Sequence, residues 1–258
     1  KVKSLAEIGE VKVDQVAIGS CTNSYYQDLM KVVGILKGKT VHPDVSLVIS
    51  PGSRQVLKML AANGALADLI AAGARILEPA CGPCIGMGQA PSTNGVSLRT
   101  FNRNFKGRCG TISAVVYLVS PETAAISSIA GSLTDPRTCE EDIAVDVPET
   151  FSVCDNMIIP PADEGVMVEV VRGPNIKPFP LNQALAEKVE GSVLLKVGDN
   201  ITTDDIMPSN AKLLPFRSNI PYLAGYCFVP CNEEFPKRAK EKNGGFVVGG
   251  ENYGQGSS

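Results

Sequence analysis

The chain of 258 residues has no tryptophan, a single histidine and no run of 18 apolar residues. Because a membrane-spanning helix needs about 20 consecutive apolar residues, no membrane span is expected. One histidine is too few for a multi-histidine metal site and argues against a histidine-based catalytic triad. Lys and Arg number 24 against 27 Asp and Glu, which leaves a net charge of −3. Nucleic acid is therefore not the expected partner of this chain.

The sequence has the composition of a globular protein, with 44% hydrophobic and 20% charged residues. The segment KVKSLAEIGE at residues 1–10 does not read as a secretory signal, so we expect a cytoplasmic protein, or one of an organelle matrix in a eukaryote. Eight cysteines are present, and only Cys81 and Cys84 form a close pair. In a reducing compartment such a pair is more often a metal or redox site than a structural bridge.

Short apolar runs alternate with helical patterns through the first half of the chain. Helical periodicity follows most of these runs, which is typical of an α/β unit with a largely parallel sheet. Residues 115–120 are ambiguous between a strand and the start of a helix. The predicted strands are residues 12–20, 45–50, 74–80 and 95–101, and the predicted helices lie within 25–38, 51–64, 65–73 and 121–131.

The composition changes after residue 138. Residues 139–170 carry nine acidic residues and no Lys or Arg, which is typical of a solvated connector. From residue 191 the segments SVLLKVGDNITTDDIMP and GGFVVGGENYG read as strands with polar turns. We therefore predict an α/β domain at 1–138, an acidic linker at 139–190 and part of a β-rich domain at 191–258.

Three cysteines directly follow predicted strands. Cys21 comes after the first strand, and Cys81 and Cys84 come after the third. The carboxyl ends of parallel strands form the ligand crevice of an open α/β sheet, so the three thiols can converge there. Three thiolates suit an iron–sulfur cluster or a zinc ion. Inert buried thiols, or a CxxC redox module that needs neither iron nor Cys21, are the alternatives.

A basic loop and a glycine-rich segment complete the candidate site. The loop Asn102-Arg103-Asn104-Phe105-Lys106-Gly107-Arg108 follows the fourth predicted strand, and its guanidiniums suit the binding of carboxylates. Glycines at 249, 250, 254 and 256 allow a ligand close to the backbone ahead of Ser257 and Ser258. Taken alone, each of these segments also fits an ordinary surface loop.

Five motifs occur together and in order. They are GSCTNS at 19–24, EPACGPCIG at 78–86, NRNFKGR at 102–108, GDNITTDD at 198–205 and GENYGQGSS at 250–258. In this combination the chain resembles the aconitase family of iron–sulfur hydro-lyases over nearly its whole length. The resemblance implies that residues 1–138 are the third, α/β domain of a three-layer type, and that 191–258 begin the mobile swivel domain.

The resemblance also implies a role for each residue that matches a family motif. Cys21, Cys81 and Cys84 would hold a [4Fe–4S] cluster with one iron free of protein ligands. The cations that would bind a small tricarboxylic acid are Arg103, Arg108 and Arg217, with Asn102 beside the cluster. Ser257 would be the base that removes a proton from carbon, Asp204 would act at the same site, and Ser258 would line the substrate pocket.

By this resemblance the expected reaction is that of aconitate hydratase, the interconversion of citrate and isocitrate through cis-aconitate. Homoaconitase and 3-isopropylmalate dehydratase share the cluster motifs and are the alternatives, although Arg217 suits a third carboxylate better than an isopropyl group. A cluster-free RNA-binding role is a further alternative. We expect the chain to be a fragment, inactive alone, because the family pattern also has domains before it and an Arg after the second serine.

Overall fold

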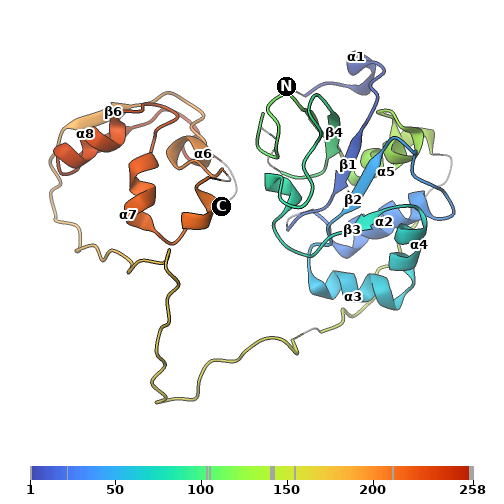
Figure 1. The fold of residues 1–258 in the computed structure, drawn as a ribbon, viewed down its shortest axis with the longest axis horizontal. Helices are drawn as coiled ribbons and strands as arrows, with labels where there is room; N and C mark the ends of the chain where they lie inside the picture. The colour runs from blue at the N-terminus through green and yellow to red at the C-terminus, as the bar shows by residue number, and fades with distance from the viewer. Residues whose placement is uncertain are drawn as a thin grey trace. The chain divides into compact units, whose positions relative to one another are not determined.

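The computed structural model describes residues 2–21, 23–102, 104, 106–139, 143–153, 155–210 and 212–255. The chain forms two compact units, residues 1–159 and 160–258, coloured blue to yellow-green and yellow to red in Figure 1. Each unit is described by itself. Within the described residues no helix is both long and apolar enough to cross a membrane.

The first unit is built on a five-stranded parallel sheet with the strand order β3-β2-β1-β4-β5. All four strands predicted from the apolar runs are present, and residues 115–118 form a strand rather than a helix. The α/β fold with a parallel sheet is therefore confirmed. The strands are β1 (Gln15–Ile18), β2 (Ser46–Ile49), β3 (Arg75–Ile76), β4 (Val96–Arg99) and β5 (Val115–Leu118).

Helices connect β1 to β2 and β2 to β3, and α3 and α5 each begin at a serine that caps them. Ser53 accepts a hydrogen bond from the Val56 N–H at the start of α3. Ser120 does the same for Thr123 at the start of α5. Such caps satisfy N–H groups that the first turn leaves unbonded. The helices are α1 (Leu5–Ile8), α2 (Tyr26–Leu36), α3 (Arg54–Ala62), α4 (Ala65–Ala71) and α5 (Pro121–Ala130).

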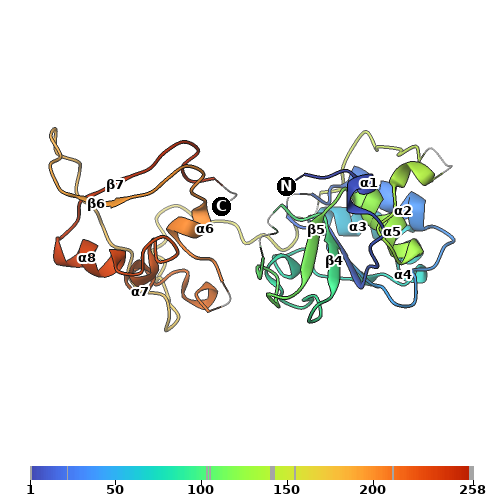
Figure 2. The same ribbon diagram turned by 90° about the horizontal axis from the view of Figure 1, so that it is seen from above.

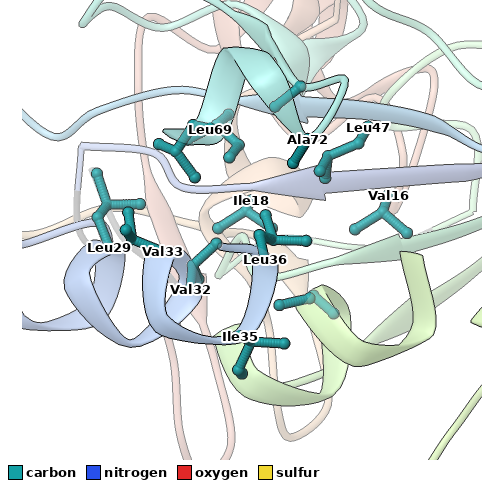
Figure 3. Close-up of a cluster of buried hydrophobic side chains, with 14 of the residues drawn as sticks. Val16, Ile18, Leu29, Val32, Val33, Ile35, Leu36, Leu47, Leu69 and Ala72 are labelled. Atoms are coloured by element: carbon teal, nitrogen blue, oxygen red, sulfur yellow. The ribbon is translucent and has the colours of Figure 1, made fainter. Parts of the chain in front are cut away.

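One face of the sheet carries the main hydrophobic core. Val16 and Ile18 of β1 lie beside Leu47 and Ile49 of β2 on this face, because parallel pairing puts them in register. Helices α2, α3, α4 and α5 all contribute buried side chains to the same cluster, part of which is shown in Figure 3. The helices therefore gather on a single face of the sheet.

Leu69 and Ile70 are neighbours on α4 with opposite environments. Leu69 is fully buried in the main core, whereas Ile70 is 57% exposed. Leu69→Ala is expected to lower the free energy of unfolding by about 2–5 kcal/mol, because it removes apolar contacts and leaves a cavity. The matched control, Ile70→Ala, should change it by roughly 0.5 kcal/mol or less. Urea unfolding of both variants checks this, and equal losses would contradict the buried position of Leu69.

The opposite face of the sheet is covered by loop rather than helix. Ala17, Val48 and Phe101 form a second, smaller cluster, and Leu77 and Cys84 pack against it. Leu77 and Cys84 belong to the connection between β3 and β4, whose only regular element is the short 3₁₀ helix η1 (Pro83–Ile85). Helices therefore cover one face of the sheet, and an irregular layer that contains the cysteine pair covers the other.

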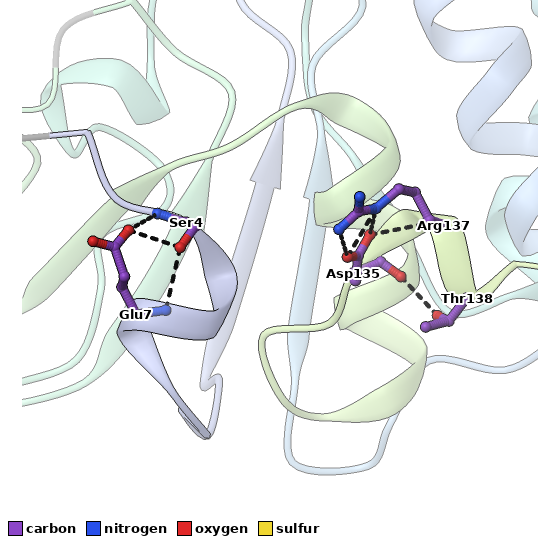
Figure 4. A network of polar contacts seen from close by, with 5 residues as sticks. All are labelled: Ser4, Glu7, Asp135, Arg137 and Thr138. Atoms are coloured by element: carbon purple, nitrogen blue, oxygen red, sulfur yellow. Dashed lines mark hydrogen bonds and ion pairs between the residues drawn. The ribbon is translucent and has the colours of Figure 1, made fainter.

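Two small polar networks stabilise local turns of the first unit (Figure 4). Ser4 and Glu7 form a reciprocal capping box at the start of α1. Asp135 accepts hydrogen bonds from the Arg137 guanidinium, with Nε at 3.0 Å, and this interaction lowers the pKa of Asp135 to about 2. The Ser4–Glu7 hydrogen bonds and the Asp135–Arg137 ion pair are both largely exposed to solvent, where such contacts contribute little to stability. We therefore assign neither a role at a site.

No helix or strand lies between η2 (Pro136–Thr138) and residue 193 within the described part of the chain. The first portion of this segment packs on the first unit, since Gln55 donates a hydrogen bond to the Ser152 carbonyl and Tyr26 contacts Phe151 edge to face. Residues 160–190 are exposed throughout. The domain boundaries at 138 and 190 stay a prediction.

The second unit contains a two-stranded parallel sheet with helices between its strands (Figure 2). Its core is formed by Leu194, Leu195, Phe228 and Phe235. Among the described residues of this unit the expected β-rich character is limited to these two strands, because parallel strands need a long crossover and the intervening residues form short helices. The elements are β6 (Val193–Lys196), α6 (Thr203–Ile206), η3 (Leu214–Phe216), α7 (Ile220–Leu223), η4 (Ala224–Tyr226), α8 (Phe235–Glu241) and β7 (Phe246–Val248).

Candidate functional site

The strand order of the first unit locates a ligand crevice. Going outward from β1, the chain adds β2 and β3 on one side and β4 and β5 on the other, so the direction of winding reverses between β1 and β4. Ligands of open α/β sheets bind outside the carboxyl ends of the strands at such a switch point. Cys21 lies just beyond the end of β1, Asn102 just beyond β4 and Cys81 a few residues beyond β3. The sequence predicts that the three cysteines and the basic loop lie at this edge.

Hydrogen bonds tie the ends of four strands together at this edge. The Gly19 N–H donates to the Thr100 hydroxyl at 2.8 Å, which links the ends of β1 and β4. Ser24 donates to the Ser50 carbonyl at 2.8 Å, which links the Cys21 turn to the end of β2. Ser50 in turn donates to the Glu78 carbonyl at 3.2 Å, three residues before Cys81. The segments that carry Cys21 and Cys81 are therefore anchored to one framework.

All three candidate thiols are free cysteines. Cys21 and Cys81 are exposed, and Cys84 is partly buried against the smaller core cluster. Among the described residues, no group of three or more His, Cys, Asp or Glu side chains is placed to hold a metal ion. What fits an iron–sulfur cluster is the donor chemistry, since three reduced thiols follow strands at one sheet edge and cysteine thiolates are the usual cluster ligands.

The turn that carries the cysteine pair approaches the backbone of another loop closely. Gly86 ends η1 with a φ of +77°. A Cβ atom at this position would overlap the Cys109 carbonyl and lie 2.7 Å from the Cys109 carbonyl carbon. Only glycine fits such a contact, so the sequence CGPCIG places the cysteine pair against the loop that follows β4.

A fully buried arginine lies beneath this turn. Arg99, in β4, donates from Nη1 to the Pro83 carbonyl at 2.6 Å, from Nε to the Ser97 hydroxyl at 3.0 Å and from Nη2 to the Gln15 amide oxygen at 2.9 Å. Gln15 donates to the Ala90 carbonyl at 2.9 Å, farther along the same loop. Burial lowers the pKa of the Arg99 guanidinium, while the thiols of Cys109 and Cys84 act to raise it. An arginine nevertheless remains protonated in proteins.

The basic loop is described only in part. Asn102 is exposed and Arg108 is half-buried, while Arg103 lies outside the described residues. Asn104 donates a hydrogen bond from its amide nitrogen to the Phe101 carbonyl, which closes the turn after β4. The described residues therefore place Asn102 and Arg108 on the loop that begins at the switch point.

The remaining predicted residues belong to the second unit. Asp204 lies in α6, whose start is capped by Thr202 and Asp205, and its carboxylate accepts a hydrogen bond from the Ser209 N–H at 3.3 Å. Arg217 follows η3 and is exposed. The isolated bridge between Thr202 and Gln255 brings the start of α6 beside the end of the glycine-rich segment. Ser257 and Ser258 lie outside the described residues.

The sequence prediction missed the supports of the site. The sequence pattern predicts Gln15, Ser97 and Arg99 only as parts of strands. Their polar side chains in otherwise apolar runs were the available signal, because a buried polar group needs a partner. Ser97 and Arg99 bind Gln15 of another strand, 82 and 84 residues away, and Arg99 and Gln15 bind the Pro83 and Ala90 carbonyls, 16 and 75 residues away, which no local pattern discloses.

Comparison with known proteins gives matches over each part of the chain. The aconitase family (aconitate hydratase) matches residues 1–131. A mitochondrial homoaconitase of Debaryomyces hansenii is 34% identical over 96% of this chain and 35% of its own length. The 3-isopropylmalate dehydratase large subunit of Moorella thermoacetica is 45% identical over 52% of this chain and 32% of its own length. The homoaconitase large subunit of Thermus thermophilus is 44% identical over 55% of this chain and 34% of its own length.

The chain thus spans about a third of the length of these relatives. The family match covers the sheet, the cysteine turn and the loop after β4, which together make up the switch-point edge. The match to the mitochondrial homoaconitase extends through nearly the whole chain. On these grounds the chain belongs to the aconitase family.

Proposed function

We propose that the protein containing this chain is a hydro-lyase that isomerises a hydroxy-acid by dehydration and rehydration. The observation that carries this proposal is the position of Cys21, Cys81 and Asn102 beyond the carboxyl ends of β1, β3 and β4, of which β1 and β4 flank the switch point, in a member of the aconitase family. Members of this family generally use a [4Fe–4S] cluster. Cys21, Cys81 and Cys84 are the residues that would hold it.

In the proposed mechanism the cluster, when bound, supplies a Lewis acid that polarises the substrate hydroxyl. The chain's own residues bind the carboxylates and move the proton. Arg103, Arg108 and Arg217 would fix the substrate, because a guanidinium binds a carboxylate in a bidentate manner. Ser257 would take the proton from carbon, with Asp204 beside it and Ser258 lining the pocket. Dehydration followed by rehydration causes no net oxidation or reduction of the substrate, so no reductant is needed.

For the substrate we propose a homoaconitase-type tricarboxylic acid. The 34% identity with a homoaconitase extends over both units, and Arg217 suits a third carboxylate. The 3-isopropylmalate dehydratase large subunits support a second candidate, although their matches cover about half of this chain. Citrate, the substrate that the motifs alone suggest, has less support from the relatives. The mitochondrial relative fits a location in an organelle matrix.

We also propose that further protein surrounds this chain in the active enzyme. The chain spans about a third of its relatives, two of which are large subunits by name. Exposed apolar side chains in the segment between η2 and β6 fit such a contact, because large exposed apolar patches usually mark interfaces. Ile159 is 91%, Met167 95% and Val171 87% exposed.

The substrate proposal predicts a ranking of kcat/KM for the full-length enzyme after anaerobic reconstitution. The kcat/KM for homocitrate should exceed that for citrate and for 3-isopropylmalate by roughly 10-fold or more, since a difference of one methylene or one carboxylate between substrates changes kcat/KM by about this factor. Absorbance of the unsaturated intermediate checks the ranking. Preference for citrate or 3-isopropylmalate would overturn the substrate choice alone, whereas dehydration of none of the three would overturn the hydro-lyase proposal.

A further inference from the structure

Arg99 is a cation in the interior of the first unit. Its side chain is 0% exposed, and all three of its recorded hydrogen-bond acceptors are neutral oxygens. Among the described residues no carboxylate forms an ion pair with it. Because burying an unpaired charge costs several kcal/mol, buried cations normally have an anionic partner. The Nη1 atom of Arg99 donates to the carbonyl of Pro83, one residue before Cys84, so the buried charge lies directly beneath the cysteine turn.

The three hydrogen bonds of Arg99 use the fork shape of the guanidinium. Nε and Nη2 bind Ser97 and Gln15 of the sheet, and Nη1 binds the Pro83 carbonyl in the middle of the Cys81–Cys84 turn. Gln15 and Ser97 are themselves in register across β1 and β4 and are joined by a 2.7 Å hydrogen bond. The sheet thus holds the cysteine turn through one side chain, which a lysine with a single nitrogen cannot reproduce.

We propose that Arg99 is the positioning residue of the cysteine turn and that its buried charge is the counter-ion of the anionic group held there. The second part rests on the proposed function, in which the anionic group is the thiolate-ligated cluster. Three thiolates bring negative charge to the turn, and net charge and hydrogen bonding near a cluster set its reduction potential. Arg99 therefore fixes the place of Cys84 and favours the reduced cluster.

Two substitutions separate position from charge. Arg99→Lys keeps the charge and loses the fork. Gln15→Glu keeps every acceptor of Arg99 and cancels its charge in place, at the cost of the hydrogen bond to Ala90. Arg75→Gln is the matched control, because Arg75 is an exposed arginine that donates to the Gly88 carbonyl of the same loop at 3.0 Å.

Alkylation of the reduced, metal-free chain tests the positioning role without reference to any cluster. Arg99→Lys should raise the ratio of the Cys84 to the Cys21 alkylation rate by about 10-fold, because loss of a charge-assisted hydrogen bond frees the turn. Gln15→Glu and Arg75→Gln should leave the ratio as in the wild type. An unchanged ratio in a folded Arg99→Lys chain, judged by circular dichroism, would overturn the positioning role. If Arg99→Lys fails to fold, Gln15→Glu is compared with the wild type instead. A rise of similar size in its ratio of Cys84 to Cys21 alkylation would overturn the positioning role, because this variant retains the guanidinium fork.

The potential of the reconstituted full-length enzyme tests the role of the charge. Gln15→Glu should shift the midpoint potential of the cluster to a more negative value, since a neutralised cation no longer favours the reduced form. Arg75→Gln should not shift it. A wild-type potential in Gln15→Glu would overturn the counter-ion role. Absence of any cluster in the wild type would instead overturn the proposed function and the counter-ion role with it, while the alkylation result still decides the positioning role.

Discussion

Replacing Cys84 with serine in the full-length enzyme is expected to abolish cluster binding and to lower hydro-lyase turnover by at least about 100-fold. Loss of a residue that only supports a metal ligand already costs roughly 10–100-fold, and loss of a ligand should cost more. Cys21→Ser and Cys81→Ser should behave alike, because each removes one of three thiolates. Iron and acid-labile sulfide per chain, measured after anaerobic reconstitution, check the result together with turnover.

Cys139→Ser is the matched control for this series. Cys139 is also a free, partly exposed cysteine of the first unit, but it follows the 3₁₀ helix η2 rather than a strand. It should retain the iron content and turnover of the wild type. Full iron content in Cys21→Ser would contradict a three-thiolate site, and it would favour a CxxC redox module, which needs only Cys81 and Cys84.

The parallel sheet was predictable because its strands are short apolar runs separated by helical periodicity. Residues 12–20 and 95–101 show this pattern clearly, and both form strands. Their adjacency was not predictable, since β1 and β4 are joined by hydrogen bonds between residues about 80 positions apart. The switch point, and with it the adjacency of the strand ends that precede Cys21 and Asn102, follows from long-range pairing that local sequence patterns do not encode.

The second unit was harder to predict for a different reason. The sequence predicts strand and turn for the segment GDNITTDDIMP, yet Thr203–Ile206 form α6. The signal was present, because Thr202 followed three residues later by Asp205 is a capping box, which favours the start of a helix. A four-residue helix is too short for hydrophobic periodicity to reveal, so the cap was its only sign.

The second large expected effect concerns Gly19, which leads from β1 into the Cys21 turn. Gly19 has a φ of +90°, and a Cβ atom there would overlap the Ser50 carbonyl oxygen and lie 2.7 Å from the Ser24 Cβ. Gly19→Ala is therefore expected to lower the free energy of unfolding by about 2–5 kcal/mol, the sum of a strained backbone and a steric overlap. Because Ser24 and Ser50 also anchor the Cys21 turn, the same change should reduce iron incorporation.

Gly38→Ala separates the two contributions. Gly38 has a similar φ of +71°, but a Cβ atom there would meet nothing within 4 Å, so its substitution measures the backbone strain alone. We expect it to cost about 1–2 kcal/mol and to leave iron incorporation unchanged. Urea unfolding of the two variants isolates the steric part as their difference. Equal losses would mean that the strand ends separate readily, and the hydrogen-bonded framework of the switch-point edge would then be too loose to hold Cys21 in place for the cluster.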